Sequence, residues 1–315
     1  MPVDPQVAAF LQRIADLNAP PIYTLTPEQA RRTVPQIPLP HEPVATIENR
    51  SVSGAYGEVP VRVYTPFSAV QKAGRGPVPL MVFYHGGGWM NADVDSYDPL
   101  SRTIANAFDC IVVSVDYRLA PENKFPAGVE DCYEATVWAY EHARSFGADP
   151  NRMIVSGDSA GGNLAAAVSL MARDRNGPPI AYQLLIYPVT DCNFETPSYQ
   201  RNATGYMLTQ KAMQWYWDAY LPLPSEAKNP YAAPLQATDL TRLPAAHVIT
   251  AEYDPLRDEG EAFAERLKAA GVPLTFKRYD GMIHGFVRRT DLFDVARKAI
   301  QEMAQETKRA LAAMS

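Results

Sequence analysis

Two patterns of apolar residues alternate along the chain. Short apolar runs predict strands, and segments between them with apolar residues at helical spacing predict helices. The runs 80–84 and 111–115 are almost entirely apolar, as in parallel strands covered on both faces. Residues 61–64 instead alternate apolar and polar side chains, like a half-buried strand. Further short β-prone runs follow at 153–156, 183–187, 247–250 and 274–277. This alternation predicts an α/β fold with a mostly parallel sheet and an antiparallel start near residues 45–64.

Helical spacing fills the segments between these runs. It is clear over 133–145, over 259–270, where Gly271 ends the helix, and over 291–312. Before the first strand, residues 7–14 show apolar helical spacing, and Thr26 precedes a proline in the manner of an N-cap. We therefore expect helices on both sides of the sheet and a separate helical arm at the N-terminus.

Composition narrows the class of protein. A chain of 315 residues can bury one large core, and its net charge of −6 argues against a nucleic-acid partner. No run of eighteen apolar residues and no positively charged signal region occurs, so we expect a cytoplasmic protein without stable membrane association. The cysteines are three and widely spaced, which favours neither a disulfide framework nor a metal site.

The pentapeptide Gly157-Asp158-Ser159-Ala160-Gly161 lies between a β-prone run and a helix-forming run. A serine in such a Gly-x-Ser-x-Gly turn is typical of a nucleophile elbow. It needs a base, and of the five histidines His284 is placed best, in a loop directly after the last predicted strand. Asp254, which follows the strand 247–251, fits best as the carboxylate that orients this base, in the chain order serine, acid, histidine. Its rivals by sequence position are Glu252, Asp258, Glu259 and Asp280.

A glycine-rich loop follows the strand 80–84 and reads His85-Gly86-Gly87-Gly88-Trp89. In this position it predicts an oxyanion loop, because glycines let backbone N–H groups approach the substrate. Ala160, directly after the serine, would donate another N–H group. A phosphate-binding loop would require a Gly-Lys-Ser/Thr ending, which is absent here.

Taken together, these motifs resemble the hormone-sensitive-lipase-like branch of the α/β-hydrolases, the family IV esterases, over nearly the whole chain. Besides the two glycine motifs, the resemblance rests on the segments 116–122, 254–260 and 284–286. It implies an α/β-hydrolase fold with an eight-stranded, mostly parallel sheet flanked by helices and a helical cap. The cap would comprise the N-terminal segment 1–42 and an insertion at about 192–225 in the catalytic domain 43–315.

The resemblance also implies the roles of the site residues. Ser159 would be the nucleophile, His284 the general base and acid, and Asp254 its orienting partner. The oxyanion N–H groups would come from Gly87, Gly88 and Ala160, and the loop would be shaped by His85 and Gly86. The reaction would be the hydrolysis of short- to medium-chain carboxylic esters without a metal or other cofactor.

The substrate contacts are less specific in the sequence. Apolar surface for an ester could come from Trp89 and from the cap candidates Tyr206, Met207 and Leu208, with Phe10, Trp215 and Trp217 as further candidates. Core packing is the alternative for all of them, and it explains Trp215 and Trp217 equally well. An amidase, a lactonase or an acyltransferase would share the triad. A non-catalytic small-ligand receptor on the same fold is a further alternative, which the presence of His284 disfavours. An edge strand near 274–279 could pair across a homodimer.

Overall fold

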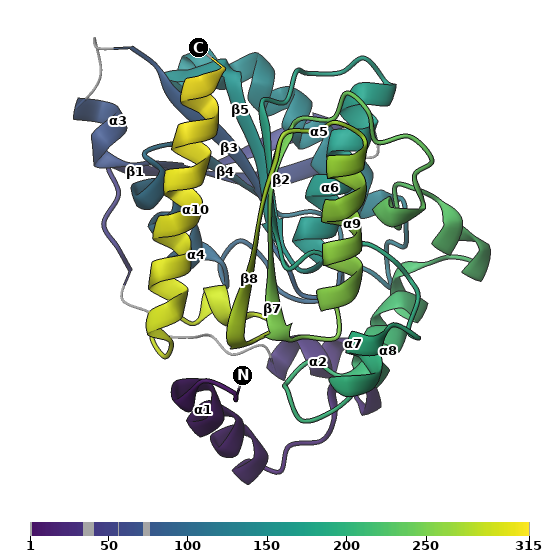
Figure 1. The fold of residues 1–315 in the computed structure, drawn as a ribbon. Coiled ribbons are helices and arrows are strands. Elements are labelled where there is room, and N and C mark those ends of the chain that lie inside the picture. Colours follow the sequence, from purple (N-terminus) through teal and green to yellow (C-terminus); the bar gives the residue numbers. More distant parts are fainter. Residues whose placement is uncertain (1, 34–40, 56, 72–75, 315) are drawn as a thin grey trace.

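The computed structural model describes residues 2–33, 41–55, 57–71 and 76–314, and in this part of the chain eight strands form one sheet. The strands lie in the order β1-β2-β4-β3-β5-β6-β7-β8 (Figure 1). Their bounds are β1 Thr46–Gly54, β2 Gly57–Thr65, β3 Val78–Tyr84, β4 Ile111–Val115, β5 Ala148–Asp158, β6 Tyr182–Ile186, β7 Ala245–Tyr253 and β8 Leu274–Ile283.

Strand directions agree with the sequence pattern. β1 pairs antiparallel with β2, and β2 pairs antiparallel with β4. The remaining neighbours, from β4 through β3 to β8, all pair in parallel. The strands β3, β4 and β6 are buried at every position, which explains the almost entirely apolar runs of β3 and β4. The predicted α/β class, the mostly parallel sheet and its antiparallel start are confirmed.

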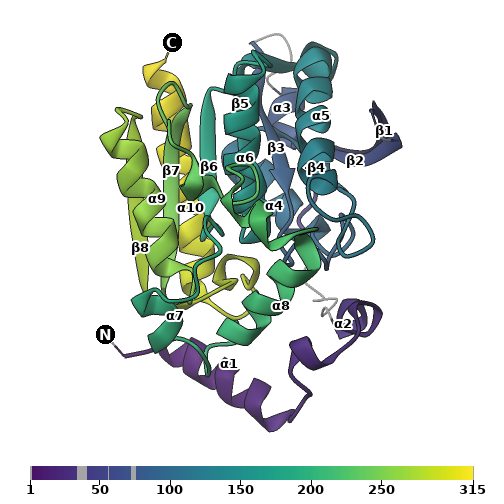
Figure 2. The same ribbon diagram turned by 90° about the vertical axis from the view of Figure 1, so that its right-hand side faces the viewer.

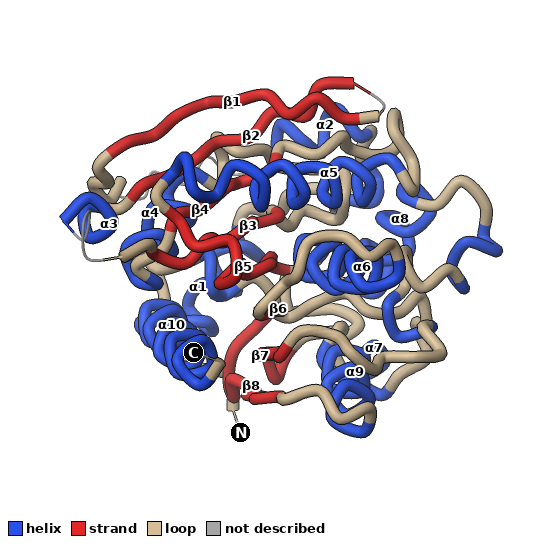
Figure 3. The backbone as a smooth tube through the Cα atoms, turned by 90° about the horizontal axis from the view of Figure 1, so that it is seen from above, coloured by secondary structure: helices blue, strands red, loops and turns tan. Residues whose placement is uncertain are grey.

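Helices cover both faces of the sheet (Figure 3). α4 and α10 pack with one set of core side chains, and α5, α6 and α9 pack with the other. The α-helices are α1 Pro5–Asp16, α2 Pro27–Thr33, α3 Phe67–Gln71, α4 Asp98–Phe108, α5 Ala127–His142, α6 Ala160–Asp174, α7 Pro197–Arg201, α8 Gln210–Tyr220, α9 Arg257–Ala269 and α10 Asp294–Ala313. Short 3-10 helices lie at Ile22–Thr24, Ala143–Phe146, Pro224–Lys228, Pro234–Gln236 and Phe286–Arg288.

Local sequence explains where α2 begins, while α5 begins earlier than its sequence pattern predicted. Thr26 caps α2, since its side chain accepts from the N–H of Gln29 while the Gln29 side chain accepts from the N–H of Thr26. α5 starts six residues before the predicted position. Its first turn lies against the segment before it, where a Cβ atom on Gly128 would lie 3.0 Å from the carbonyl oxygen of Arg118.

The segments expected to form a cap lie at one end of the molecule, where α1, α2, α7 and α8 gather (Figures 1 and 2). α7 contacts the turn after β7, where the Ser198 hydroxyl donates to the carbonyl of Pro255 at 2.6 Å. The N-terminal arm reaches α8, where the Lys211 ammonium lies 5.9 Å from the centre of the Tyr23 ring. Residues 1 and 34–40 of the expected cap segment lie outside the described residues.

Candidate active site

Ser159 lies in a sharp turn between the end of β5 and the start of α6. Its φ of 59° and ψ of −120° are unusual for a residue with a side chain, and such strain is typical of functional positions. Glycines make the turn feasible. A Cβ atom on Gly157 would overlap the backbone of Gly161, and one on Gly161 would overlap the carbonyl oxygen of Tyr84. Strand, helix and the neighbouring β3 can therefore approach one another closely around the serine.

Ser159, His284 and Asp254 form a continuous series of hydrogen bonds. His284 Nε2 lies 2.8 Å from Ser159 Oγ, and His284 Nδ1 lies 2.7 Å from Asp254 Oδ2. The three side chains come from the carboxyl ends of β5, β8 and β7, the edge where α/β sheets assemble their sites. Asp254 is fully buried, while 9% of Ser159 and 7% of His284 is exposed. The arrangement is that of a nucleophile beside a base whose tautomer is fixed by a carboxylate.

Asp254 is itself held on both its side chain and its backbone. Its second oxygen, Oδ1, accepts from the N–H of Leu256 at 2.9 Å. The side-chain amide of Asn202, just after α7, donates to the Asp254 carbonyl at 3.1 Å. These bonds leave the carboxylate with one orientation, in which Oδ2 points at the imidazole.

The rival carboxylates have other partners. Glu252 accepts from the N–H of Gly281, Asp258 from that of Ser198 and Glu259 from that of Thr190, each at 2.7 Å. Asp280 is exposed. Glu259 is nevertheless buried in the first turn of α9, where burial raises its pKa well above the usual range. The structure thus brings only Asp254 of these five candidates into hydrogen-bond contact with His284 among the described residues.

The other four histidines also lie away from Ser159 Oγ. His41 bonds to Asp98, and the exposed His142 bonds to the carbonyl of Trp138. His247 is buried in β7 beside the Thr275 hydroxyl, and burial lowers its pKa to about 4. His85 is buried before the glycine loop, and burial lowers its pKa to about 4 as well.

The glycine loop turns sharply after β3. Gly87 and Gly88 have φ values of 118° and 62°, and the N–H groups of Met90 and Asn91 both donate to the Gly87 carbonyl. Among the described residues, the N–H groups of Gly87, Gly88 and Ala160 donate no hydrogen bond. These three donors, two in the loop and one at the N-terminus of α6, therefore remain available to a ligand.

His85 and Gly86 anchor the base of this loop. The His85 ring stacks on Tyr117 with centroids 4.3 Å apart, and the Tyr117 hydroxyl donates to the His85 carbonyl at 2.7 Å. The Gly86 N–H is shared between the Tyr97 hydroxyl at 2.9 Å and Asp158 Oδ1 at 3.0 Å. Gly86 is thus committed to the scaffold, unlike the two glycines that follow it.

Asp158 and Arg288 were not singled out by sequence reasoning. Asp158 is 2% exposed, and burial raises its pKa while the charge of nearby Arg288 opposes that shift. The Arg288 guanidinium lies 4.0 Å from the centre of the Tyr97 ring. Their only sequence signal is proximity, since Asp158 precedes the serine and Arg288 follows His284 by four residues.

Trp89 packs into an aromatic cluster rather than facing solvent. Its indole is 1% exposed, stacks on Tyr220 at 4.2 Å and lies 4.8 Å from Trp217. Its Nε1–H donates to Asn163 Oδ1 at 3.3 Å. The residue between the two tryptophans of α8, Tyr216, also contacts the glycine loop, at Gly88. A Cβ atom on Gly88 would fall within its ring, and sequence reasoning missed this contact.

The cap candidates around residue 206 lie near the histidine loop. Met207 is 46% exposed, and its Cε would lie 3.3 Å from a Cβ atom on Gly285. The Tyr206 ring lies 4.8 Å from that of Tyr253, and Leu208 is partly buried. Met207 is thus placed next to the loop that carries His284, while its role toward a substrate stays a prediction.

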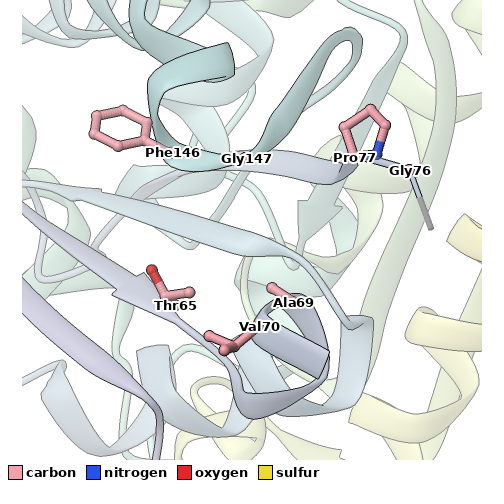
Figure 4. A pocket seen from close by; sticks show the side chains of 7 residues that line it. All are labelled: Thr65, Ala69, Val70, Gly76, Pro77, Phe146 and Gly147. Carbon is pink, nitrogen blue, oxygen red and sulfur yellow. The ribbon is translucent and has the colours of Figure 1, made fainter. Parts of the chain in front are cut away.

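A cavity of about 590 Å³ lies away from these residues (Figure 4). It is bordered by the end of β2, by α3 and by the turn before β5, with Thr65, Val70 and Phe146 in its lining. No cluster of three or more His, Cys, Asp or Glu side chains suited to a metal ion occurs among the described residues. Within that same part of the chain, every helix is too short or too polar to cross a membrane.

Comparisons with known proteins agree with this geometry. A family model for the alpha/beta hydrolase fold matches residues 81–288. The carboxylesterase NlhH of Mycobacterium tuberculosis is 40% identical over 290 residues, which cover 90% of this chain and 89% of that protein. The arylesterase of Saccharolobus solfataricus is 38% identical over 291 residues, with coverages of 91% and 93%.

Structural similarity extends as far. The hyperthermophilic esterase from the archaeon Pyrobaculum calidifontis has a TM-score of 0.92 and 39% identity, covering 98% of this chain and 99% of that one. Sequence and structure are therefore alike over nearly the full length. The chain belongs to the hormone-sensitive-lipase-like branch of the α/β-hydrolase family.

Proposed function

We propose that this protein is a serine carboxylesterase that hydrolyses small carboxylic esters through an acyl-enzyme on Ser159. The observation that carries the proposal is the hydrogen-bonded series from Ser159 Oγ through His284 to Asp254. The carboxylesterase and arylesterase named above are relatives over about nine-tenths of the chain, which supports the same reaction class.

In the first half of the reaction, Ser159 Oγ attacks the ester carbonyl carbon. His284 Nε2 takes the hydroxyl proton as the new bond forms, and Asp254 stabilises the resulting imidazolium through Nδ1–H. The tetrahedral intermediate then collapses. Its bond to the alkoxy group breaks, the imidazolium returns the proton to that oxygen, and the alcohol leaves.

Negative charge develops on the carbonyl oxygen during both halves of the reaction. The N–H groups of Gly87, Gly88 and Ala160 carry no other hydrogen bond among the described residues, so we assign them to this oxyanion. Loss of one such donor typically costs about 10²- to 10³-fold in kcat.

In the second half, His284 takes a proton from water, and the resulting hydroxide attacks the acyl carbon. Collapse of the second tetrahedral intermediate breaks the bond to Ser159 Oγ, and His284 returns the proton to that oxygen. The acid leaves and the starting state is restored. The side chains described suffice for each proton transfer.

Replacement of the serine tests the proposal directly. Ser159→Ala should lower the turnover of p-nitrophenyl butyrate by at least about 10⁴-fold and abolish the mass increase caused by a fluorophosphonate. Ser169→Ala is the matched control, because Ser169 is a buried serine of α6 whose hydroxyl bonds to the Ala165 carbonyl. Substantial turnover in Ser159→Ala, with folded protein by circular dichroism, would refute the assignment.

The same assay separates the alternatives. An anilide or a lactone cleaved faster than every p-nitrophenyl ester would indicate an amidase or a lactonase. Faster transfer to an added alcohol than to water would indicate an acyltransferase. Saturable binding of an ester without hydrolysis would instead indicate a receptor.

For the substrate, we propose esters with short to medium acyl chains, in contact with Tyr206, Met207 and Leu208. Trp89, which the sequence also suggested, is 1% exposed within its aromatic cluster and is left out of this proposed contact. The burial of Ser159 and His284 favours small substrates, since little of either side chain is exposed. A series of p-nitrophenyl esters from acetate to palmitate measures the preference. We expect kcat/KM to be greatest at eight carbons or fewer, and each methylene to change it by no more than about 1–3 kcal/mol.

Assembly and location are further proposals. β8 is an edge strand whose Phe276 is 43% exposed, which supports a homodimer formed by pairing of this edge. Light scattering of wild type and of a variant with proline at an outward N–H of β8 would test it. We also propose that the protein acts in the cytoplasm, which cell fractionation would test.

A further inference from the structure

Asp158 lies inside the nucleophile pentapeptide, yet no step of the proposed reaction uses its carboxylate. The side chain is almost fully buried at the end of β5. Burying a charged group is costly unless it is well bonded, so its partners indicate what it does. Both of its oxygens have partners, and these come from three segments distant in sequence.

The first partner is the oxyanion loop. Asp158 Oδ1 accepts the Gly86 N–H at 3.0 Å, and Oδ2 accepts the Tyr97 hydroxyl at 3.1 Å. The Tyr97 oxygen is also 2.9 Å from the same Gly86 N–H, so both groups hold one peptide. That peptide directly precedes Gly87 and Gly88, the residues whose N–H groups we assign to the oxyanion.

The second partner leads to the base. The Tyr187 hydroxyl donates to Asp158 Oδ2 at 3.4 Å, and the Tyr187 ring lies 4.8 Å from the His284 ring. Tyr187 directly follows β6, and its φ of 34° lies in the left-handed region. This backbone conformation is unfavourable for a residue with a large side chain. The guanidinium of Arg288, in the segment after His284, lies 4.0 Å from the centre of the Tyr97 ring and is a nearby countercharge for Asp158.

From these contacts we infer that Asp158 is a positioning residue, which fixes the oxyanion loop relative to Ser159. The inference rests on the proposed function. Because Asp158 is joined to Ser159 by one peptide bond and to Gly86 by one hydrogen bond, the nucleophile and the oxyanion donors share a single short connection. A shift of about 1 Å in such donors is enough to reduce the rate markedly.

The test is Asp158→Asn, which keeps the shape of the side chain and removes its charge. One face of the new amide is a donor, so it cannot accept from Gly86, Tyr97 and Tyr187 together. We expect kcat for p-nitrophenyl butyrate to fall by about 10- to 100-fold, with KM within about threefold of wild type, because the lost interaction acts in the transition state.

Asp98→Asn is the matched control. Asp98 is also a buried carboxylate that accepts from a tyrosine hydroxyl, that of Tyr64 at 3.0 Å, and from an arginine, Arg102 at 2.7 Å. It belongs to α4, and in the described part of the chain its hydrogen bonds and ion pairs reach no residue of the proposed site. It should lower the urea midpoint of unfolding by an amount similar to Asp158→Asn and leave kcat unchanged.

A second readout reports on the oxyanion itself. A trifluoromethyl ketone forms a tetrahedral oxyanion on the serine, so its inhibition constant should rise in Asp158→Asn by the factor by which kcat/KM falls. Tyr97→Phe removes one of the two acceptors of the Gly86 N–H and leaves Asp158 in place. We expect it to change kcat and the inhibition constant in the same direction by a smaller factor.

The outcomes separate this inference from the proposed function. Wild-type protein that hydrolyses no ester and takes up no fluorophosphonate would overturn both. Active wild type with an Asp158→Asn variant equal to Asp98→Asn in kcat would overturn the positioning role alone. So would a loss of activity in Asp158→Asn without a change in the inhibition constant of the ketone.

Discussion

The two sides of the proposed reaction centre consist of different kinds of side chain. Behind the glycine loop, the scaffold holds buried polar groups in hydrogen bonds, among them His85, Tyr97 and Asp158. In front, the cap segments place aromatic and apolar side chains such as Tyr216 and Met207 against the loops. Hydrogen bonds therefore fix the orientation of groups on the scaffold side, and packing of apolar side chains determines the shape of the cap side.

Magnitudes explain this division. A hydrogen bond to a charged group contributes about 1.5–3 kcal/mol and has a preferred geometry, whereas an apolar contact is non-directional. Groups that must meet a transition state within a fraction of an ångström lie on the scaffold. The side chains proposed to fill space beside an ester belong to the expected cap, where we expect substitution to alter substrate preference rather than chemistry.

The largest effect should come from breaking the scaffold at Asp254. Asp254→Asn keeps the size of the side chain, but its amide can hold His284 in the tautomer that leaves Nε2 protonated. We expect kcat to fall by about 10⁴-fold with little change in KM. Stopped-flow measurement of the p-nitrophenol burst checks this, and Glu252→Gln serves as control because Glu252 bonds to Gly281 instead. Loss of activity in the control and not in Asp254→Asn would reverse the assignment.

The second largest effect on kcat should come from a substitution at the contact between the glycine loop and α8. Gly88→Ala would drive a methyl group into the Tyr216 ring at a φ of 62°. Since Gly88 is assigned to the oxyanion, we expect kcat to fall by about 10²-fold. In the double variant with Tyr216→Ala, the overlap is removed and only the backbone strain remains. Recovery of at least about tenfold in kcat would locate the effect in this contact, and additive losses would contradict it.

These positions also show what the sequence could and could not reveal. The strands β3 and β4 were predictable because both faces are buried, which makes their apolar runs continuous. The sites of Ser159, Asp254 and His284 followed from the rule that parallel strands present their carboxyl ends at one edge. Each of these inferences depends on short segments and on chain order.

The remainder depends on contacts between distant segments. The hydrogen bond between Asp158 and Gly86 joins residues 72 positions apart, and no local sequence pattern predicts it. On α8 the sequence drew attention to Trp215 and Trp217, and Trp217 does pack against Trp89, but the contact of Tyr216 with Gly88 was missed. α5 also begins six residues before the predicted start, and its first turn lies close to the backbone of Arg118.

Acid should weaken the scaffold through its buried histidines. The pKa of His85 and that of His247 are lowered to about 4 by burial, below the value of about 6.5 in the unfolded chain. Between these two pKa values the unfolded state binds more protons than the folded state. The contribution of the two histidines to the free energy of unfolding is therefore fully present above pH 6.5 and is lost as the pH falls toward 4. Each histidine contributes a slope of up to about 1.4 kcal/mol per pH unit.

A difference measurement isolates this effect. Buried Glu259 has a raised pKa and contributes the opposite slope, so the total is not diagnostic. Urea unfolding of wild type and His247→Gln at pH 7, 6 and 5 gives the contribution of His247 alone. The variant should lose less stability on acidification, while His142→Gln, at an exposed position, should parallel wild type. Equal slopes in all three proteins would contradict the burial argument.

The smallest effect should come from the cap side, at Arg31 of α2. Its guanidinium donates to the carbonyls of Met90 at 2.8 Å and Ala120 at 2.9 Å, and it pairs with Glu122 at 2.6 Å. The ion pair is exposed and contributes little, on the order of 0.5 kcal/mol, so the two carbonyl bonds should dominate. We expect Arg31→Met to lower kcat/KM by about fivefold, because Met90 directly follows the glycine loop and Trp89.

Comparison with Glu122→Gln separates the two contributions. If the carbonyl bonds hold the arm to the loop, Glu122→Gln should change kcat/KM by less than about twofold, and the effect of Arg31→Met should persist at 1 M salt, where exposed ion pairs are screened. Equal losses in the two variants that vanish at high salt would mean that the arm is held by charge alone. The exposed ion pair alone would then hold α2 in place, and the hydrogen bonds of Arg31 to the Met90 and Ala120 carbonyls would not contribute to the geometry of the site.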